Sequence, residues 1–407
     1  MSNKLLQYYY KEDKSIPIGV RGMVDDTIGV SKCGNTAVQL NSVINSFIET
    51  QRLTLSKEKS SVVHIGSKLK CKVQCPKLKV HDSDMSEADS VKYLGNIVTS
   101  RGGVTETIED RRNKGWGKVA TILGIIKEVD MGSRRLEVRL LLRRAILVNS
   151  LLFTAEAWSG VKEAELRRLE KVDQHLLRSL LFLHSKGALE FLHLESGTLK
   201  LRHILTINRM MYHHHILNLD ENETVKKIYN KQKKKTSKGD WYDLLLKDFK
   251  FIDKDLNEKE IKEMSKEDYK KTIKELVEKA AMKYFLEEKK SHSKLEEVFY
   301  DKLQLQPYLT DRRFSTEERK LLVLLRSRCF SAKTNFKKLW KENLECSLGC
   351  SSNEDQRHIF TQCIWLPPSP EIIYENIYKE TNEQKETIEV FLKKETHRKH
   401  LLDNLLK

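Results

Sequence analysis

Four residues near the C-terminus have the types and spacing of a metal-binding cluster. They form a C-x3-C-x7-H-x4-C pattern: Cys346, Cys350, His358 and Cys363. Gly349 supplies a turn that lets two thiolates converge, and residues 353–355 can start a short helix that carries the histidine toward the last cysteine. Three thiolates and an imidazole hold Zn²⁺ tetrahedrally and leave no open position for catalysis. We therefore expect a structural zinc site.

A pair of carboxylates lies near the N-terminus between two apolar runs. Residues 20–33 read VRGMVDDTIGVSKC, so Asp25 and Asp26 are expected at the tip of a β-hairpin. Crowded carboxylates suit Mg²⁺, which prefers hard oxygen ligands together with substrate phosphate. Two such ions stabilise the attacking and leaving oxygens of phosphoryl transfer. Adjacent aspartates are also common in solvated turns, so the pair by itself leaves both interpretations open.

The elements that must position the carboxylates lie in the first hundred residues. Short runs rich in Val and Ile, separated by Gly, Ser and Pro, predict strands at 16–20, 27–30, 61–65, 70–73, 78–80 and 91–98. Between them, residues 36–52 predict a helix with Val38, Val43, Phe47 and Ile48 on one side. This part of the chain therefore has an α+β pattern.

The rest of the chain, from about residue 106, has helical periodicity. Apolar residues three and four positions apart predict one buried stripe: Leu166, Leu169, Val172, Leu176, Leu180 and Leu183. Ser265, followed three residues later by Asp268, predicts the start of another helix. Residues 231–239, KQKKKTSKG, predict an exposed basic loop or hinge. Residues 367–370, PPSP, predict a stiff break before a polar helical tail.

Composition and charge restrict the class of protein. The 407 residues carry 74 Lys+Arg against 58 Asp+Glu, a formal net charge of +16, which favours polyanionic partners because neutralised phosphates release counterions. No apolar run approaches the about 20 residues of a membrane span, and residues 1–14 lack the apolar core of a secretion signal. We expect an intracellular protein of the nucleus or cytoplasm, neither secreted nor membrane-bound, whose partner is nucleic acid.

Three short motifs follow one another in an informative order. Met23-Val24-Asp25-Asp26 comes first, a Lys-bearing turn precedes the strand-like SVVHIG, and Lys92-Tyr93-Leu94-Gly95 comes third. This order resembles the C-terminal half of the palm in reverse transcriptases of non-LTR (LINE-like) retrotransposons. Three later segments look like the thumb and post-thumb region of that family: RRNKGWGKVATI (111–122), ILVNSLLFTAEAW (146–158) and LESGTLKLRHIL (194–205). The similarity covers about residues 15–365.

The resemblance implies an activity and a role for each motif. The activity is RNA-directed DNA polymerisation, a nucleotidyltransferase reaction with template RNA, primer DNA and deoxynucleoside triphosphates. Asp25 and Asp26 would hold catalytic Mg²⁺, and Lys59 (or Lys57) would lie near the incoming triphosphate. The third motif would form a primer-gripping hairpin that contacts nucleic acid through Lys92, Tyr93 and Gly95. Met23 departs from the family's aromatic residue. The cysteine and histidine cluster looks like the family's CCHC zinc knuckle.

The carboxylates for catalysis are incomplete in this sequence. The resemblance implies a further carboxylate from an earlier palm strand, but only 24 residues precede Asp25, and Glu12 and Asp13 lie in the polar segment KEDKS. We therefore expect a truncated polymerase of a transposable element that binds RNA or DNA and is inactive alone. The alternative is a helical interaction scaffold with a structural zinc site and no nucleic-acid role.

Further basic and aromatic residues are candidates for nucleic-acid contacts. Arg135, Arg139 and Arg143 recur every fourth residue and predict a helical stripe that follows a phosphate backbone, although a merely solvated face is equally compatible. Trp116 and Trp158 have side chains that stack on bases, but we favour buried aromatic anchors for both.

Two other groups of potential metal ligands are better explained without metal. Cys71 and Cys75 alternate along a predicted β-hairpin, which favours apolar packing. The tract 213–215 consists of three histidines, but consecutive helical residues lie about 100° apart and do not all face one ion. We expect these histidines on a helix surface.

We therefore expect an α+β fold that is mostly α. The expected segments are a partial reverse-transcriptase palm (1–103), a helical thumb (104–220), a helical region with a basic loop (221–325), a zinc knuckle (326–366) and a polar helical tail (367–407).

Overall fold

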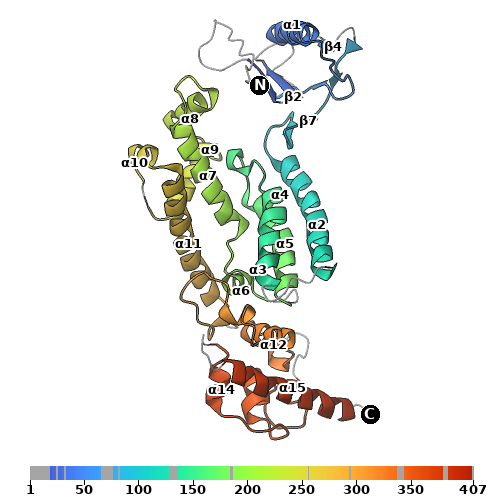
Figure 1. The fold of residues 1–407 in the computed structure, drawn as a ribbon, viewed down its shortest axis with the longest axis vertical. Coiled ribbons are helices and arrows are strands. Elements are labelled where there is room, and N and C mark those ends of the chain that lie inside the picture. The colour runs from blue at the N-terminus through green and yellow to red at the C-terminus, as the bar shows by residue number, and fades with distance from the viewer. Residues whose placement is uncertain are drawn as a thin grey trace. The chain divides into compact units, whose positions relative to one another are not determined.

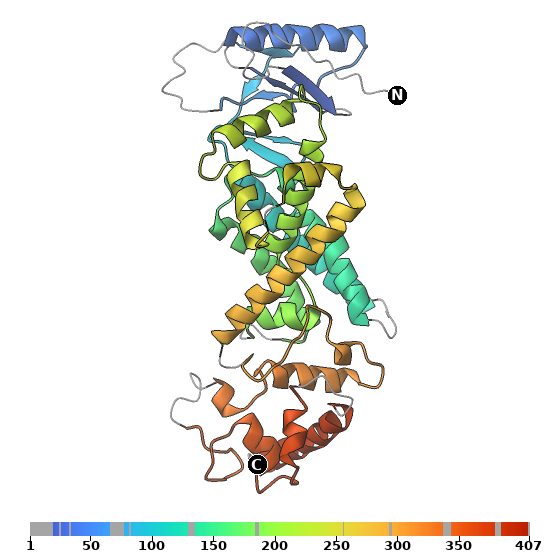
Figure 2. The ribbon, with the colours of Figure 1, turned by 90° about the vertical axis from the view of Figure 1, so that its left-hand side faces the viewer.

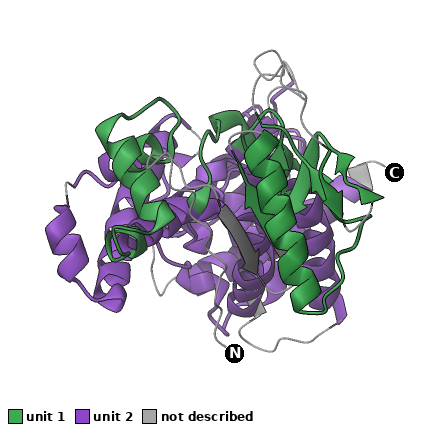
Figure 3. Cartoon of the chain, turned by 90° about the horizontal axis from the view of Figure 1, so that it is seen from above, with its two compact units in different colours: residues 1–111, 157–165, 215–246 green, residues 112–156, 166–214, 247–407 purple. Residues whose placement is uncertain are grey.

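The computed structural model describes residues 19–23, 26–31, 34–65, 77–80, 83–128, 135–183, 187–254, 256–292, 295–336, 343–378 and 384–405 (Figure 1). The chain is 61% helix and 7% strand, which confirms the predicted α+β, mostly helical class. It divides into two compact units, which Figure 3 distinguishes by colour. The first comprises residues 1–111, 157–165 and 215–246, and the second comprises 112–156, 166–214 and 247–407.

A hairpin and a helix open the first unit. Strands β1 (Gly19–Met23) and β2 (Asp26–Val30) pair antiparallel, as the sequence predicts. Helix α1 (Gly34–Thr50) packs across them (Figure 2). The predicted apolar side of this helix is wrong in part, because Val38 and Phe47 are each 40% exposed while Leu40 and Ile48 are buried. Residues 40 and 48 lie about 80° apart around the helix axis, so both are on the side of α1 that faces the hairpin.

Six further strands of the first unit form three separate two-stranded sheets. β3 (Ser61–Val62) runs parallel to β6 (Ser86–Glu87), and the antiparallel pairs are β4 (Lys79–Val80) with β5 (Ser83–Asp84) and β7 (Ser90–Tyr93) with β8 (Asn96–Thr99). The strand expected at 91–98 is instead a hairpin, because Leu94 and Gly95 have φ angles of 46° and 81°, which suit a tight two-residue turn. The strand expected at 70–73 lies outside the described residues.

Helices make up the middle of the chain. They are α2 (Thr105–Glu128), α3 (Arg135–Leu142), α4 (Asn149–Leu151), α5 (Glu163–Leu180), α6 (Leu189–Ser196), α7 (Leu201–Leu217), α8 (Thr224–Lys234), α9 (Trp241–Phe251), α10 (Glu258–Glu263) and α11 (Lys266–Lys290), with a π-helical turn at Arg143–Val148 and a 3-10 turn at Ala155–Ala157. No described helix has the length and apolar character to cross a membrane.

Local sequence signals placed two of these helices correctly. All six residues of the predicted stripe around α5 are buried. Ser265 caps α11, and its hydroxyl accepts a hydrogen bond from the backbone N–H of Asp268. The basic loop predicted at 231–239 is wrong in its first half, because α8 continues to Lys234. Lysine is a good helix former, and the first strong helix breaker in the segment is Gly239.

Gly115 determines how closely three helices of the second unit approach. A Cβ atom at this position on α2 would lie 2.6 Å from Cδ2 of Leu151 on α4 and 3.2 Å from Cγ1 of Val172 on α5. Only glycine fits such a contact without displacing the neighbouring helices. Within the KGWGK segment, the first glycine therefore has a packing role.

A buried ion pair ties α6 to the C-terminal part of the second unit. Glu195 and Arg326 are each fully buried, and Nε of Arg326 lies 2.7 Å from Oε1 of Glu195. Tyr300 and Tyr308 donate hydrogen bonds from their hydroxyls to the same carboxylate. Nη1 of Arg326 donates to the carbonyl oxygen of Ile377 at 2.9 Å. The pair therefore joins four segments that are distant in sequence.

Residues after 306 form several helices and helical turns around an apolar centre. They are a 3-10 turn at Pro307–Leu309, α12 (Thr316–Arg326), a 3-10 turn at Lys333–Phe336, a π-helical turn at His358–Gln362, α14 (Glu371–Glu375) and α15 (Gln384–Leu405). Helix α15 packs against α12 and buries Ile388 and Phe391 completely. The tail predicted for 367–407 is helical as expected, but it is not polar throughout, because α15 has an apolar side that the many Lys and Glu residues around it obscure.

Two histidines lie buried between helices of the second unit. His193 and His203 are each 1% exposed, and the ring of His203 stacks on Phe251 with centroids 5.0 Å apart. Neither ring nitrogen of His203 has a hydrogen-bond partner among the residues that the structure describes. Burial, assisted by nearby Lys200, lowers the pKa of His203 to about 3, and burial also lowers the pKa of His193. Both rings are therefore neutral in the folded protein near pH 7.

We expect acid to destabilise the protein partly through His203. In the unfolded chain its pKa returns to about 6.5, so below that pH the unfolded state binds a proton that the folded state excludes until about pH 3. The free energy of unfolding attributable to this residue falls by about 2 kcal/mol between pH 7 and pH 5. His203→Phe should flatten the pH dependence of urea unfolding by that amount. His215→Phe, an exposed position on the same helix, is the control, and equal slopes for both variants would contradict the prediction.

Candidate metal centre and nucleic-acid interface

The predicted cysteine and histidine cluster assembles in the second unit. One ligand atom from each of Cys346, Cys350, His358 and Cys363 lies within 4.8 Å of every other, and all four residues are buried. Sγ of Cys363 lies 4.0 Å from Sγ of Cys346 and 3.6 Å from Sγ of Cys350. Zinc–sulfur bonds of 2.3 Å at tetrahedral angles place sulfurs about 3.8 Å apart. The cluster can therefore hold a metal ion.

A tight turn brings the first two thiols together. The N–H of Gly349 donates to the carbonyl of Cys346 at 3.0 Å, and Gly349 has a φ of 88° that favours glycine. An antiparallel bridge between Glu345 and Asn353 closes the loop behind them, with the N–H of Cys346 bonded to the carbonyl of Ser352 at 2.9 Å. Local backbone hydrogen bonds thus bring these two ligands together.

A single π-helical turn positions the other two ligands. The N–H of Cys363 donates to the carbonyl of His358 at 2.7 Å, an i to i+5 bond that brings residues five apart onto one side of the turn. The carboxylate of Asp355 accepts from the backbone N–H of His358 at 2.7 Å and so fixes the start of the turn. The short helix expected from residues 353–355 is therefore present in a slightly later position.

The chemistry of the four side chains favours a bound cation over an empty core. His358 is 3% exposed, yet neither ring nitrogen has a hydrogen-bond partner within the described residues, an arrangement that is costly unless another group satisfies a nitrogen. Burial raises the pKa of the Cys346 thiol, and it raises the pKa of the Cys363 thiol to about 12. A metal would offset this penalty, since it binds the deprotonated sulfur.

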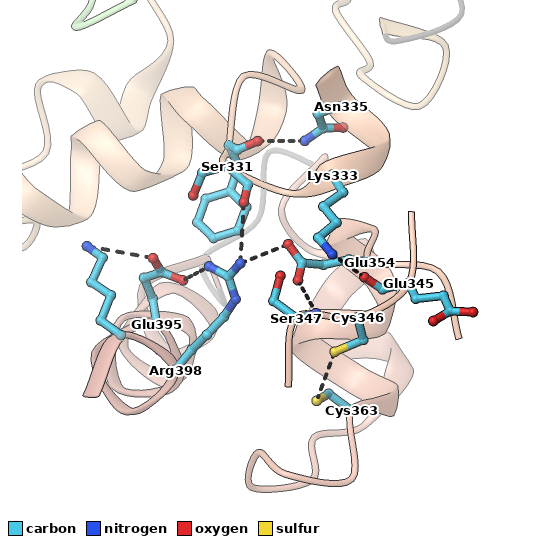
Figure 4. Close-up of polar contacts among 12 residues, drawn as sticks. Ser331, Lys333, Asn335, Glu345, Cys346, Ser347, Glu354, Cys363, Glu395 and Arg398 are labelled. Atoms are coloured by element: carbon cyan, nitrogen blue, oxygen red, sulfur yellow. Dashed lines mark hydrogen bonds and ion pairs between the residues drawn. The ribbon is translucent and has the colours of Figure 1, made fainter. Parts of the chain in front are cut away.

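Buried polar residues around the cluster hold its loop in place. Figure 4 shows Glu354 between Ser347 and Arg398: its carboxylate accepts from the Ser347 N–H at 2.8 Å and from Nη2 of Arg398 at 2.9 Å. Lys333 donates to the carbonyl of Glu345 at 2.7 Å. Glu354 and Arg398 are 2% and 5% exposed, so this ion pair is shielded from water. Sequence reasoning missed both residues; the only signal was a polar side chain on the apolar side of α15.

Aromatic rings pack around the π-helical turn that begins at His358. Phe360, in the π-helical turn, is fully buried and packs on Phe330 and Phe391 with ring centroids 5.3 Å and 4.2 Å apart. Lys394 donates to the carbonyl of Phe360. Because Phe360 lies between two of the metal ligands, the packing of α15 and the geometry of the cluster are coupled.

The aspartate pair falls at the predicted hairpin, but its side chains are outside the described residues. Asp26 begins β2, and its backbone pairs with that of Met23 at the end of β1. Asp25 lies in the undescribed connection between these strands. The hairpin predicted from the VRGMVDDTIGV pattern is therefore confirmed, while Mg²⁺ binding at its tip stays a prediction.

The two other motifs of the N-terminal part adopt the predicted local structures. Lys57 and Lys59 are exposed in a turn that leads into β3, where the N–H of Ser60 donates to the carbonyl of Lys57 at 3.2 Å. Lys92 is exposed and Tyr93 half-buried at the end of β7. The roles of these residues toward a triphosphate or a primer stay predictions.

The β7–β8 hairpin is anchored to the start of α2. Nη2 of Arg111 donates to the carbonyl of Gly95 at 2.7 Å, and the N–H of Ile97 donates to the hydroxyl of Thr107 at 2.8 Å. Nε1 of Trp158 lies 3.4 Å from Oδ1 of Asn96. These contacts fix the position of the Lys-Tyr-Leu-Gly turn relative to the start of α2.

The predicted stripe of Arg135, Arg139 and Arg143 does not form one exposed surface. Arg143 is 4% exposed, and its guanidinium forms two hydrogen bonds of 2.6 Å with the buried carboxylate of Asp173, so its assignment to nucleic-acid binding is corrected. Arg139 is half-buried. The side chain of Arg135 lies outside the described residues. An arginine repeat has the same spacing whether it faces solvent or a carboxylate on another helix.

The predicted burial of the tryptophans and the predicted exposure of the histidine tract are each only partly confirmed. Trp158 is 4% exposed, as expected for a buried anchor, but Trp116 is 42% exposed and is not one. In the histidine tract, His213 and His214 are buried and only His215 lies on the helix surface. The segment that contains Cys71 and Cys75 is outside the described residues.

Comparisons with protein-family models, with curated proteins and with solved structures found no match to this chain.

Proposed function

We propose that this chain is the C-terminal part of a non-LTR retrotransposon reverse transcriptase that binds nucleic acid and carries a structural zinc ion. The observation that carries the proposal is the order of local structures. A hairpin with Asp26 at its turn is followed by a helix, by an exposed lysine turn before a strand, and by a Lys-Tyr-Leu-Gly hairpin fixed to a long helix. This is the order that the resemblance implies for the end of a palm and the start of a thumb.

Zinc is the metal that suits the C-terminal cluster best. Three sulfurs and one imidazole are soft or borderline ligands, which select zinc over Mg²⁺ or Ca²⁺. All four ligands come from the protein and are buried, so the ion would have a structural role and no catalytic one. At the other end of the chain, Asp25 and Asp26 would provide hard oxygen ligands for Mg²⁺.

The net charge of +16 supports nucleic acid as the partner. We expect the whole purified chain to bind a short RNA hairpin and the matching DNA hairpin, measured by fluorescence anisotropy. Because each phosphate contact releases counterions, the logarithm of the affinity should fall steeply and linearly with the logarithm of salt concentration, with a slope of about −0.9 per neutralised phosphate.

A specific result would favour the interaction scaffold instead. If the chain binds neither RNA nor DNA at low salt while it remains folded and metal-loaded, the nucleic-acid proposal fails. A heparin-saturated sample serves as the polyanion control, because the proposed binding should be lost when heparin occupies the same cationic surface.

A further inference from the structure

Trp116 is an exposed aromatic residue in the middle of a long helix. Its side chain is 42% exposed on α2, and its ring meets the ring of His175 on α5 edge to face, with centroids 5.2 Å apart and an interplanar angle of 67°. A single exposed apolar residue is common on protein surfaces and indicates nothing alone. The surroundings of Trp116 decide its significance.

The exposed face of α5 beside Trp116 is basic. Arg168, Lys171 and His175 are all exposed and lie three and four positions apart, which places them in one row along the helix. The acidic residues of this part of α5 turn inward. Glu170, 5% exposed, pairs with Arg202 at 3.0 Å, and Asp173, 1% exposed, pairs with Arg143. Both carboxylates are therefore paired with arginines, and residues 168–175 place no acidic side chain on the exposed face of α5.

Close packing of α2 and α5 places the aromatic ring next to the basic row. Gly115, adjacent to Trp116, lets Val172 approach α2 more closely than any side chain would allow. Val172 lies between Lys171 and Asp173 on α5, and His175, four positions after Lys171, contacts the ring of Trp116. The ring and the row therefore lie at the same contact between α2 and α5. Trp116, Lys171 and His175 all belong to the second unit, and each is positioned by a helix and not by a loop.

We propose that this α2–α5 surface binds a single-stranded segment of nucleic acid. Trp116 would stack on one unpaired base, with His175 at the edge of that base, and Arg168 and Lys171 would contact the flanking phosphates. This inference rests on the proposed nucleic-acid-binding function. It adds that the bound nucleic acid is single-stranded and that these four side chains contact it. An unpaired base is required because only an unpaired base presents its face to an exposed ring.

The stacking role is tested on the whole chain with a fluorescein-labelled oligouridylate and an oligothymidylate of about 12 nucleotides. Stacking of one base on an aromatic side chain is lost in Trp116→Ala, which should weaken binding about 10-fold or more, whereas Trp116→Phe should keep most of the affinity. The affinity of Trp116→Ala for a blunt duplex of the same charge should differ from that of the wild-type chain by less than about 2-fold, because a duplex has no unpaired base to stack. Because Trp116 is on the surface, the far-UV circular dichroism should not change.

The phosphate contact is tested by two variants with the same change of charge. Lys171→Gln should weaken single-strand binding and reduce the magnitude of the salt slope by about 0.7, the value for one phosphate contact on a single strand. Lys118→Gln is the matched control, because Lys118 is exposed on α2 but lies about 200° around the helix from Trp116. It should leave the slope unchanged.

The outcomes separate this inference from the proposed function. If the wild-type chain binds nucleic acid but folded Trp116→Ala binds single strands as tightly, the α2–α5 site is wrong and the proposed function stands. Equal losses for duplex and single strand, or equal effects of the two lysine variants, also overturn the site. If the wild-type chain binds neither form, the proposed function fails and this inference fails with it.

Discussion

Replacing Cys363 by serine is expected to release the metal and unfold the C-terminal helices. Cys363 is the ligand whose sulfur lies within 4.0 Å of both other sulfurs, and it ends the π-helical turn that also carries His358 and Phe360. Structural zinc contributes about 10–16 kcal/mol in small domains that have little other core. Here Phe360 and Phe391 supply a core as well, so we expect a loss of about 4 kcal/mol or more in the free energy of unfolding.

Metal analysis and thermal unfolding measure this effect together. The wild-type chain should carry about one zinc per molecule, and the variant should carry little and become sensitive to proteolysis after residue 326. Cys329→Ser is the matched control, because Cys329 is also a buried thiol of the same region but lies outside the cluster. A wild-type chain without zinc, or a Cys363 variant as stable as the Cys329 variant, would rule out the metal centre.

Replacing Arg326 by leucine is expected to destabilise the second unit by about 3–5 kcal/mol. The substitution leaves the carboxylate of Glu195 buried without its cation, and removal of one partner from a buried pair costs about that much. Tyr300 and Tyr308 still donate to Glu195, but neutral hydroxyls do not replace the charge. The carbonyl of Ile377 also loses its donor. Urea unfolding followed by circular dichroism measures the change.

Two further variants show whether burial is the cause. Arg313→Leu removes an arginine that is 58% exposed and paired with Asp311, so we expect a much smaller loss of stability than Arg326→Leu causes. Combining Arg326→Leu with Glu195→Gln removes both charges and should recover part of the lost stability. If the double variant is no more stable than Arg326→Leu alone, the unpaired carboxylate is not the source of the instability.

The sequence alone determined the features that depend on near neighbours. The spacing of Cys346, Cys350, His358 and Cys363 was sufficient to identify the cluster, because each pair of ligands converges through a local turn. The cap of α11 at Ser265 and the hairpin at residues 19–30 likewise involve groups a few positions apart. Hydrogen bonds of this kind form between residues that the chain itself keeps close.

Only the tertiary structure decided which polar and aromatic residues are inside. Arg143 was expected at the surface, but it is buried against Asp173. Trp116 was expected in the core, but it is exposed beside His175. Helix α15, read as a polar tail, buries Arg398 against Glu354 and supports the metal ligands. Each of these buried charges has a partner in a distant part of the chain, an opposite charge or a backbone carbonyl, and helical periodicity holds no information about that partner.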